Sequence, residues 1–189
     1  MSVKISVDLD GVLVDWVTGY RQLVKELVGV DLPAATTWQW DREVLGKERV
    51  AEVWRWIHAH PGWWLRLQSL EGYPAFDRLN QLARRGVDVY FITARPEGTK
   101  RVAEDWLERH GIEFPTVVLA RSKWIACAGI GVQYGLDDHE EYAEGCAQEA
   151  DVNMTILDAP YNQGWTGQRV ECVSEWLDVV VKQEGLHED

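Results

Sequence analysis

Short hydrophobic runs alternate along the chain with amphipathic stretches, and this alternation indicates the class of fold. The runs rich in β-branched residues predict strands at residues 3–7, 87–93, 116–120, 132–136 and 153–157. Around the later runs, apolar residues recur at helical spacing and predict helices at residues 73–86, 98–111, 122–131, 138–150 and 173–185. Strands that alternate with helices are typical of an α/β protein, in which helices cover both faces of a parallel sheet. We therefore expect a five-stranded parallel sheet.

The first expected strand is far from the second, and a single crossover helix would not fill the interval of residues 8–86. Helical spacing within it predicts helices at residues 15–30 and 47–60, with Asp15 as the cap of the first. The same interval holds seven of the eleven tryptophans, at positions 16, 38, 40, 54, 56, 63 and 64. We expect a small helical domain, residues 16–72, inserted into a core domain made of residues 1–15 and 73–189.

The charge of the chain narrows the classes of ligand. A net charge of -12 at pH 7 disfavours a nucleic-acid polymer or an anionic membrane surface, because both require a basic face. A small phosphorylated ligand stays compatible with this charge if one pocket is locally positive or carries a metal. No apolar run approaches the roughly 20 residues of a membrane span. The N-terminus has no pattern of a signal peptide either, and we expect a cytoplasmic protein.

The three cysteines, Cys127, Cys146 and Cys172, are odd in number and widely separated, and they lack the spacing of metal ligands. We interpret them as buried or half-buried thiols of a reducing compartment.

The carboxylates of Asp8 and Asp10 follow the first expected strand, in the stretch DLDGVLVD. Residues i and i+2 of a strand point to the same face, so these two side chains should project together from its C-terminal end. Two like charges held this close repel each other unless a cation or a proton compensates. The pair therefore indicates a metal site or an acid/base site, although an Asp-x-Asp pair on its own is more often a cap or turn acceptor.

Ligands of open α/β sheets bind at the carboxyl ends of the strands. Residues that follow the other expected strands are therefore candidates to act together with Asp8 and Asp10. Thr93, followed by Ala94, places a hydroxyl beside backbone amides that open a helix, which suits a phosphate oxygen. Lys123 adds a positive charge for the same anion. Asp137 and Asp138 follow the fourth expected strand and suit a hard cation such as Mg²⁺.

Taken in order, these residues resemble the four motifs of the haloacid dehalogenase-like phosphatases: Asp8-x-Asp10-Gly11-Val12, Thr93, Lys123 and Asp137-Asp138. The helical segment lies between the first two motifs, as in the subgroup with a cap at that place. Residues 61–82 and 156–164 resemble segments of the 5'(3')-deoxyribonucleotidases within this superfamily. The resemblance covers nearly the whole chain and implies a Rossmann-like sheet with strand order 3-2-1-4-5.

The resemblance also implies a role for each motif residue. Asp8 would be the nucleophile that attacks phosphorus and forms an aspartyl-phosphate, and Asp10 would protonate the leaving oxygen and then activate water. Mg²⁺ would be held by Asp8, the backbone carbonyl of Asp10 and Asp137, with Asp138 near or behind them. The phosphoryl oxygens would be held by Thr93, Ala94 and Lys123.

The cap tryptophans include candidates for contact with the substrate. Trp63 and Trp64 align with the base-stacking aromatics of the resembled family, and only one of them should face the substrate, since neighbours in an extended segment point oppositely. Trp38 and Trp40 fit either a second stacking element or a mobile lid. Arg95 is interpreted as a surface or structural arginine rather than a substrate contact.

The sequence thus predicts a Mg²⁺-dependent phosphomonoesterase for nucleoside monophosphates, with a homodimer compatible with the resemblance. One alternative keeps the chemistry and changes the substrate to another small phosphate ester, such as a sugar phosphate. Another is a catalytically idle relative that binds a nucleotide or a protein through its tryptophan-rich cap.

Overall fold

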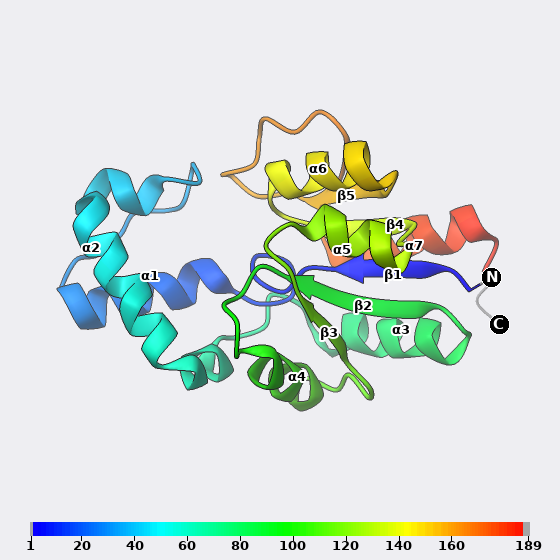
Figure 1. The fold of residues 1–189 in the computed structure, drawn as a ribbon, viewed down its shortest axis with the longest axis horizontal. Coiled ribbons are helices and arrows are strands. Elements are labelled where there is room, and N and C mark those ends of the chain that lie inside the picture. The colour runs from blue at the N-terminus through cyan, green and yellow to red at the C-terminus, as the bar shows by residue number, and fades with distance from the viewer. Residues whose placement is uncertain (1, 187–189) are drawn as a thin grey trace.

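A six-stranded parallel sheet forms the centre of the computed structural model, which describes residues 2–186 (Figure 1). Residues 1 and 187–189, the ends of the expected core domain, lie outside this description. The strand order is β3-β2-β1-β4-β5-β6. The strands are β1 (Lys4–Val7), β2 (Asp88–Thr93), β3 (Thr116–Leu119), β4 (Tyr134–Asp137), β5 (Asn153–Leu157) and β6 (Gln168–Val170).

The expected strand number is wrong by one, while the parallel α/β sheet and the order of its first five strands are confirmed. The additional strand, β6, has only three residues, and two of them are the polar Gln168 and Arg169. Such a segment carries no hydrophobic pattern of its own. It becomes a strand because its backbone pairs with β5 at the edge of the sheet.

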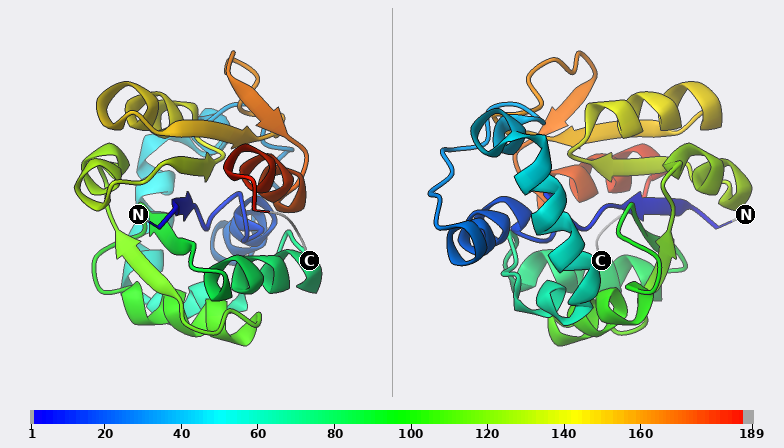
Figure 2. Two further views of the ribbon diagram at one scale, coloured as in Figure 1. Left: turned by 90° about the vertical axis from the view of Figure 1, so that its right-hand side faces the viewer. Right: turned by 60° about the vertical axis from the view of Figure 1, so that its left-hand side comes forward.

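Helices cover both faces of the sheet, as Figure 2 shows in its end-on view. Two helices pack against each other on one face, and three lie on the other. The first group is α5 (Lys123–Ile130) and α6 (Glu140–Ala150), and the second is α3 (Tyr73–Arg84), α4 (Lys100–Arg109) and α7 (Val173–Glu184). Within residues 2–186, no helix has the length and apolar character needed to cross a membrane.

Alternating side chains of the strands supply a hydrophobic core to each face. Phe91 of β2 joins the core beneath α3, α4 and α7, while its neighbour Ile92 joins the core beneath α5 and α6. Cys127 and Cys146 are buried free thiols in the second core, and Cys172 is half-buried and also free. The interpretation of these cysteines as buried or half-buried thiols is confirmed.

Between β1 and α3 the chain forms three helical elements that lie beyond the carboxyl ends of the strands (Figure 1). They are α1 (Trp16–Val28), α2 (Trp40–Ala59) and the 3-10 helix η1 (Pro61–Arg66). Asp15 caps α1 as expected, because its Oδ1 accepts a hydrogen bond from the Thr18 amide at 3.1 Å. The second helix begins earlier than its periodicity indicates and is kinked at Gly46, where φ is 76°.

The helical segment shares its core with the sheet instead of forming a separate one. Tyr20 of α1 and Ile57 of α2 belong to the same buried cluster as Phe76 of α3 and Trp106 of α4. The indole Nε1 of Trp106 donates a hydrogen bond to the carbonyl of Leu67 at 2.9 Å, just after η1. This contact fixes the returning end of the insertion against the sheet domain.

We predict that Trp106→Ala lowers the free energy of unfolding by about 3–5 kcal/mol, because it empties a fully buried site and leaves the Leu67 carbonyl without its donor. Urea unfolding measures this change. Phe114→Ala is the matched control, since Phe114 is 90% exposed and its removal should change stability by less than about 0.5 kcal/mol. Equal losses in the two variants would contradict the packing role of Trp106.

Candidate active site

A tight turn after β1 places the first two carboxylates. The strand ends at Val7, and the amides of Leu13 and Val14 both return to the carbonyl of Leu9, at 2.9 and 2.8 Å. Asp10 therefore lies in the turn and not in the strand, so strand alternation is not the reason that Asp8 and Asp10 come together. Both side chains nevertheless line one cavity at the carboxyl end of the sheet.

Lys123 joins the ends of two strands through its buried ammonium group. Its Nζ lies 2.9 Å from Oδ1 of Asp8 and 2.6 Å from Oδ2 of Asp137, and all three side chains are almost fully buried. Oδ1 of Asp137 accepts hydrogen bonds from the amides of Asp138 and His139, each at 3.0 Å. Both oxygens of Asp137 are therefore engaged by the protein itself.

Asp138 is held differently from Asp137. Its Oδ2 accepts a hydrogen bond from the hydroxyl of Tyr161 at 2.7 Å, and its carboxylate packs directly on Gly11. A Cβ at Gly11 would lie 1.9 Å from Oδ2 of Asp138, and Gly11 has a φ of 82°, so a side chain there is excluded by contact and by conformation. Asn162 fixes the loop of Tyr161 by donating to the carbonyls of Asp138 and Leu157.

The buried carboxylates fit a divalent cation. Oxygens of Asp8, Asp137 and Asp138 all lie within 4.8 Å of one another. Oδ1 of Asp8 is buried, and among the described residues it makes no regular hydrogen bond beyond its ion pair with Lys123. Three carboxylates beside one ammonium leave an excess of negative charge, which a hard cation bound by oxygen ligands would offset.

Burial shifts the protonation of this cluster. Desolvation raises the pKa of Asp8 from 3.8 to about 7, although the charge of Lys123 acts in the opposite direction. Desolvation, together with the charges of Asp8 and Asp137, also raises the pKa of Asp138 well above its ordinary value. Burial alone would lower the pKa of Lys123, but the charges of Asp137 and Asp8 outweigh it and raise that pKa.

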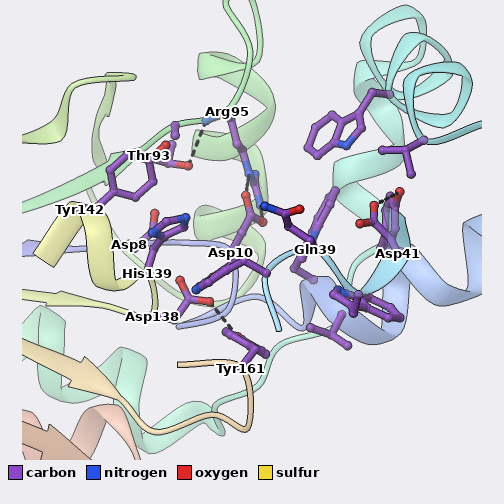
Figure 3. A pocket seen from close by; sticks show the side chains of 18 of the residues that line it. Asp8, Asp10, Gln39, Asp41, Thr93, Arg95, Asp138, His139, Tyr142 and Tyr161 are labelled. Atoms are coloured by element: carbon purple, nitrogen blue, oxygen red, sulfur yellow. Dashed lines mark hydrogen bonds and ion pairs between the residues drawn. The ribbon is translucent and has the colours of Figure 1, made fainter. Parts of the chain in front are cut away.

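The end of β2 faces the same cavity. Thr93 is buried, and its Oγ1 accepts a hydrogen bond from the amide of Arg95 at 3.3 Å. Arg95 extends across the cavity to Asp10: Nε lies 2.8 Å from Oδ2 and Nη2 lies 2.7 Å from Oδ1. Figure 3 shows this pair with Thr93 and Asp8 close by. Arg95 is thus fully buried in the site, and its interpretation as a surface residue is wrong.

The cavity has a volume of about 500 Å³ and opens from the strand ends toward the helical segment. Figure 3 places Asp8, Thr93 and Asp138 on one side of it and Gln39 and Asp41 on the other. Aromatic side chains from the helical segment form most of the second side: Trp16, Tyr20, Trp38, Trp40, Trp54 and Trp64.

Trp63 and Trp64 lie in the 3-10 helix η1, not in an extended segment, and both are buried. Trp64 lines the large cavity, whereas Trp63 lines a smaller one between α1 and η1. The ring of Trp64 stacks on Trp16 at 5.1 Å and carries the guanidinium of Arg95 at 4.3 Å. Trp64 is only 2% exposed and contacts both Trp16 and Arg95, so little of its ring surface is left for a base.

Three aromatic residues of the site, His139, Tyr142 and Tyr161, are not singled out by periodicity or by the spacing of the four motifs. His139 caps α6 and stacks on Trp38 with ring centroids 4.1 Å apart. The ring of Tyr142 lies 4.7 Å from Nζ of Lys123, and Tyr161 binds Asp138. Tyr161 belongs to the stretch ILDAPYNQG that carries the family resemblance, but only the fold brings its hydroxyl to the end of β4.

The sheet order, the insertion after β1 and the buried aspartates at the strand ends define a phosphatase of the haloacid dehalogenase-like superfamily. The family model described as "5' nucleotidase, deoxy (Pyrimidine), cytosolic type C protein" matches residues 1–184. The chain belongs to this family. No sequence among the curated proteins matches it significantly.

Solved structures with the same fold are distant in sequence. A haloacid dehalogenase-like hydrolase from Streptococcus pneumoniae superposes with a TM-score of 0.64 at 15% identity, covering 95% of this chain and 98% of that one. A HAD-superfamily hydrolase of subfamily IA from Geobacter sulfurreducens gives 0.59 at 17% identity, covering 95% and 96%. CbbY from Rhodobacter sphaeroides, solved in complex with phosphate, gives 0.59 at 15% identity, covering 93% and 96%.

We predict that the metal-free protein loses stability as the pH rises from about 4 to about 7, through Asp8. The folded chain holds a proton on Asp8 that the unfolded chain has already released, so a rising pH favours unfolding over this range. Urea unfolding in EDTA, at several pH values, should show a shallower decline for Asp8→Asn than for the native chain. Asp31→Asn, which removes an exposed carboxylate, should keep the native slope. The same slope in all three proteins would contradict the raised pKa of Asp8.

Proposed function

We propose that the protein is a Mg²⁺-dependent phosphomonoesterase that hydrolyses nucleoside monophosphates through an aspartyl-phosphate on Asp8. The observation that carries this proposal is the arrangement of Asp8, Lys123 and Asp138 at the strand ends, beside a cavity with aromatic walls. The family match supports the nucleotide as substrate. Its description as cytosolic supports the cytoplasm as the location.

In the first half of the reaction, a carboxylate oxygen of Asp8 attacks phosphorus, and the bond from phosphorus to the ester oxygen breaks. Lys123 lies 2.9 Å from Asp8 and supplies positive charge to the transferring phosphoryl group. The hydroxyl of Thr93 and the amide of Ala94 are placed to hold its oxygens, since both residues line the cavity at the end of β2. These contacts position the phosphorus for attack.

Asp10 is the general acid in the first half of the reaction and the general base in the second. It gives a proton to the departing ester oxygen, which leaves as an alcohol, and Asp10 is then a carboxylate. In the second half, Asp10 takes a proton from the water that attacks phosphorus, and the bond between Asp8 and phosphorus breaks. Inorganic phosphate leaves, and both aspartates return to their starting states.

Mg²⁺ fits the carboxylate cluster, and the contacts favour Asp138 over Asp137 as its second side-chain ligand beside Asp8. Both oxygens of Asp137 are already engaged by Lys123 and by backbone amides, whereas the carboxylate of Asp138 accepts only from Tyr161 among the described residues. The backbone carbonyl of Asp10 completes the protein ligands that we propose. When bound, Mg²⁺ would offset the repulsion between the carboxylate and the phosphate dianion.

The cap of residues 16–72 supplies the part of the cavity that would receive the nucleoside. An aromatic wall offers π-faces to a flat base, with little dependence on which base is bound. A sugar phosphate is the second candidate, because Gln39 and Asp41 also line the cavity and offer partners for hydroxyl groups. An idle nucleotide-binding or protein-binding relative is the third, and a proton-transferring residue such as Asp10 argues against it.

We predict metal-dependent release of phosphate from deoxyribonucleoside monophosphates, measured against ribonucleotides, 3'-phosphates and sugar phosphates, with Mg²⁺ or with EDTA. Asp8→Asn should lower kcat at least about a thousandfold, because no covalent route remains. Asp15→Asn is the matched control: it removes a carboxylate near the same turn that only caps α1, and should keep the native kcat. Turnover of sugar phosphates alone would move the assignment to the second candidate, and no turnover despite bound Mg²⁺ would favour the third.

We also predict that Trp38→Ala raises KM for a nucleoside monophosphate by about 5- to 150-fold with a smaller effect on kcat, because stacking on a base contributes about 1–3 kcal/mol. Trp56→Ala is the control. Each of these tryptophans stacks on a histidine at 4.1 Å, but only Trp38 lines the cavity. Steady-state kinetics of the two variants distinguish the roles, and an equal change of KM in both would exclude Trp38 as a substrate contact.

A further inference from the structure

Arg95 holds the side chain of Asp10 by a two-pronged contact. Its Nε and Nη2 lie 2.8 and 2.7 Å from the two carboxylate oxygens of Asp10, which is the geometry of a bidentate guanidinium–carboxylate pair. The side chain of Arg95 is 0% exposed, whereas that of Asp10 is 19% exposed toward the cavity. The buried arginine thus fixes a carboxylate that remains open to a ligand.

Two further contacts fix the guanidinium itself. It lies over the ring of Trp64 at 4.3 Å, and Trp64 is stacked in turn on Trp16. The amide of Arg95 donates to Oγ1 of Thr93, so the arginine is joined to the end of β2 as well as to the cap. A planar guanidinium placed on an aromatic ring has little freedom to rotate, and its fork sets the plane of the carboxylate that it binds.

One nitrogen of the Arg95 guanidinium makes no hydrogen bond to the described residues. Among the described residues, Nη1 is buried without a hydrogen-bond partner, and Arg95 lines the large cavity. A purely structural buried arginine would have its donors satisfied by the protein, because an unsatisfied buried donor costs free energy. This unpartnered donor sets Arg95 apart from a purely structural arginine.

We propose that Arg95 is the positioning residue of Asp10, which the fork holds in the orientation needed for proton transfer to and from the reacting oxygens. A carboxylate has about four lone-pair positions, so the two contacts with Arg95 leave others that face the cavity. Without the fork, the Asp10 side chain would rotate among several conformations. This inference rests on the proposed phosphomonoesterase function.

The identity of the leaving group separates positioning of the acid from a general structural role. The alkoxide of a nucleoside is a strong base and leaves only when it receives a proton, whereas 4-nitrophenolate leaves without one. Removal of a group that orients the acid should therefore lower kcat much more for a nucleoside monophosphate than for 4-nitrophenyl phosphate. General acid catalysis contributes about 10²–10⁴-fold to the rate.

The experiment compares kcat of the native protein and of Arg95→Ala on these two esters, with Mg²⁺ present. We expect a loss of about 100-fold on the nucleotide and less than about 10-fold on the nitrophenyl ester. Added guanidinium at millimolar concentration should restore part of the nucleotide activity of Arg95→Ala, which also demonstrates that the variant is folded. Arg95→Lys should remain impaired, because an ammonium group does not form the fork.

A double-mutant cycle tests whether Arg95 affects kcat through Asp10. Asp10→Asn combined with Arg95→Ala should be no slower on the nucleotide than Asp10→Asn alone, since residues that act as a unit are not additive. Arg21→Ala is the control for loss of an arginine with a purely structural bond, in this case to the carbonyl of Leu32, and should keep native kcat on both esters.

Three results would overturn the assignment. Equal losses on the two esters, or additive losses in the double variant, would show that Arg95 only supports the fold, and the phosphatase proposal would stand. If the native protein hydrolysed neither of these esters nor a sugar phosphate, the phosphatase proposal itself would fall, and the positioning role of Arg95 with it.

Discussion

The ammonium group of Lys123, buried between Asp8 and Asp137, is the interaction on which the site depends. It joins the start of α5 to the ends of β1 and β4, so the nucleophile that we propose is fixed by three elements of the core. Charges buried in this way are tolerated only when they are paired, and removing one partner leaves an uncompensated charge of high cost. The same contact therefore holds the strand ends together and supplies positive charge where a phosphoryl group would bind.

The carboxylates of the site differ in whether a cationic side chain pairs with them. Arg95 pairs with Asp10, and Lys123 is shared by Asp8 and Asp137, while the carboxylate of Asp138 has only the neutral hydroxyl of Tyr161 as a side-chain partner among the described residues. The surplus of negative charge thus lies at Asp8 and Asp138, which is where a divalent cation fits. In the function that we propose, proton transfer and cation binding are assigned to different carboxylates: Asp10 pairs with Arg95, whereas Asp8 and Asp138 do not.

The helical segment contributes to this arrangement as well as forming the outer wall of the cavity. Its aromatic cluster continues the core beneath the sheet, and the indole of Trp64 supports Arg95, which in turn holds Asp10. The cap is thereby connected through two contacts to Asp10, the group to which we assign proton transfer. Trp38 makes a further contact between the cap and the core, because it stacks on His139 at the cavity.

The sequence by itself determined the α/β class, the helical insertion and the polar residues that follow the strands, because these depend on local periodicity and on short motifs. The order of the first five strands came from the resemblance to the haloacid dehalogenase-like phosphatases. The tertiary structure decided the rest. The polar β6 exists only through pairing with β5, and the 3-10 helix turns Trp63 and Trp64 toward different cavities. The pairing of Arg95 with Asp10 joins residues that no short pattern relates. Such contacts form between distant segments, and a local pattern contains no information about which of them will meet.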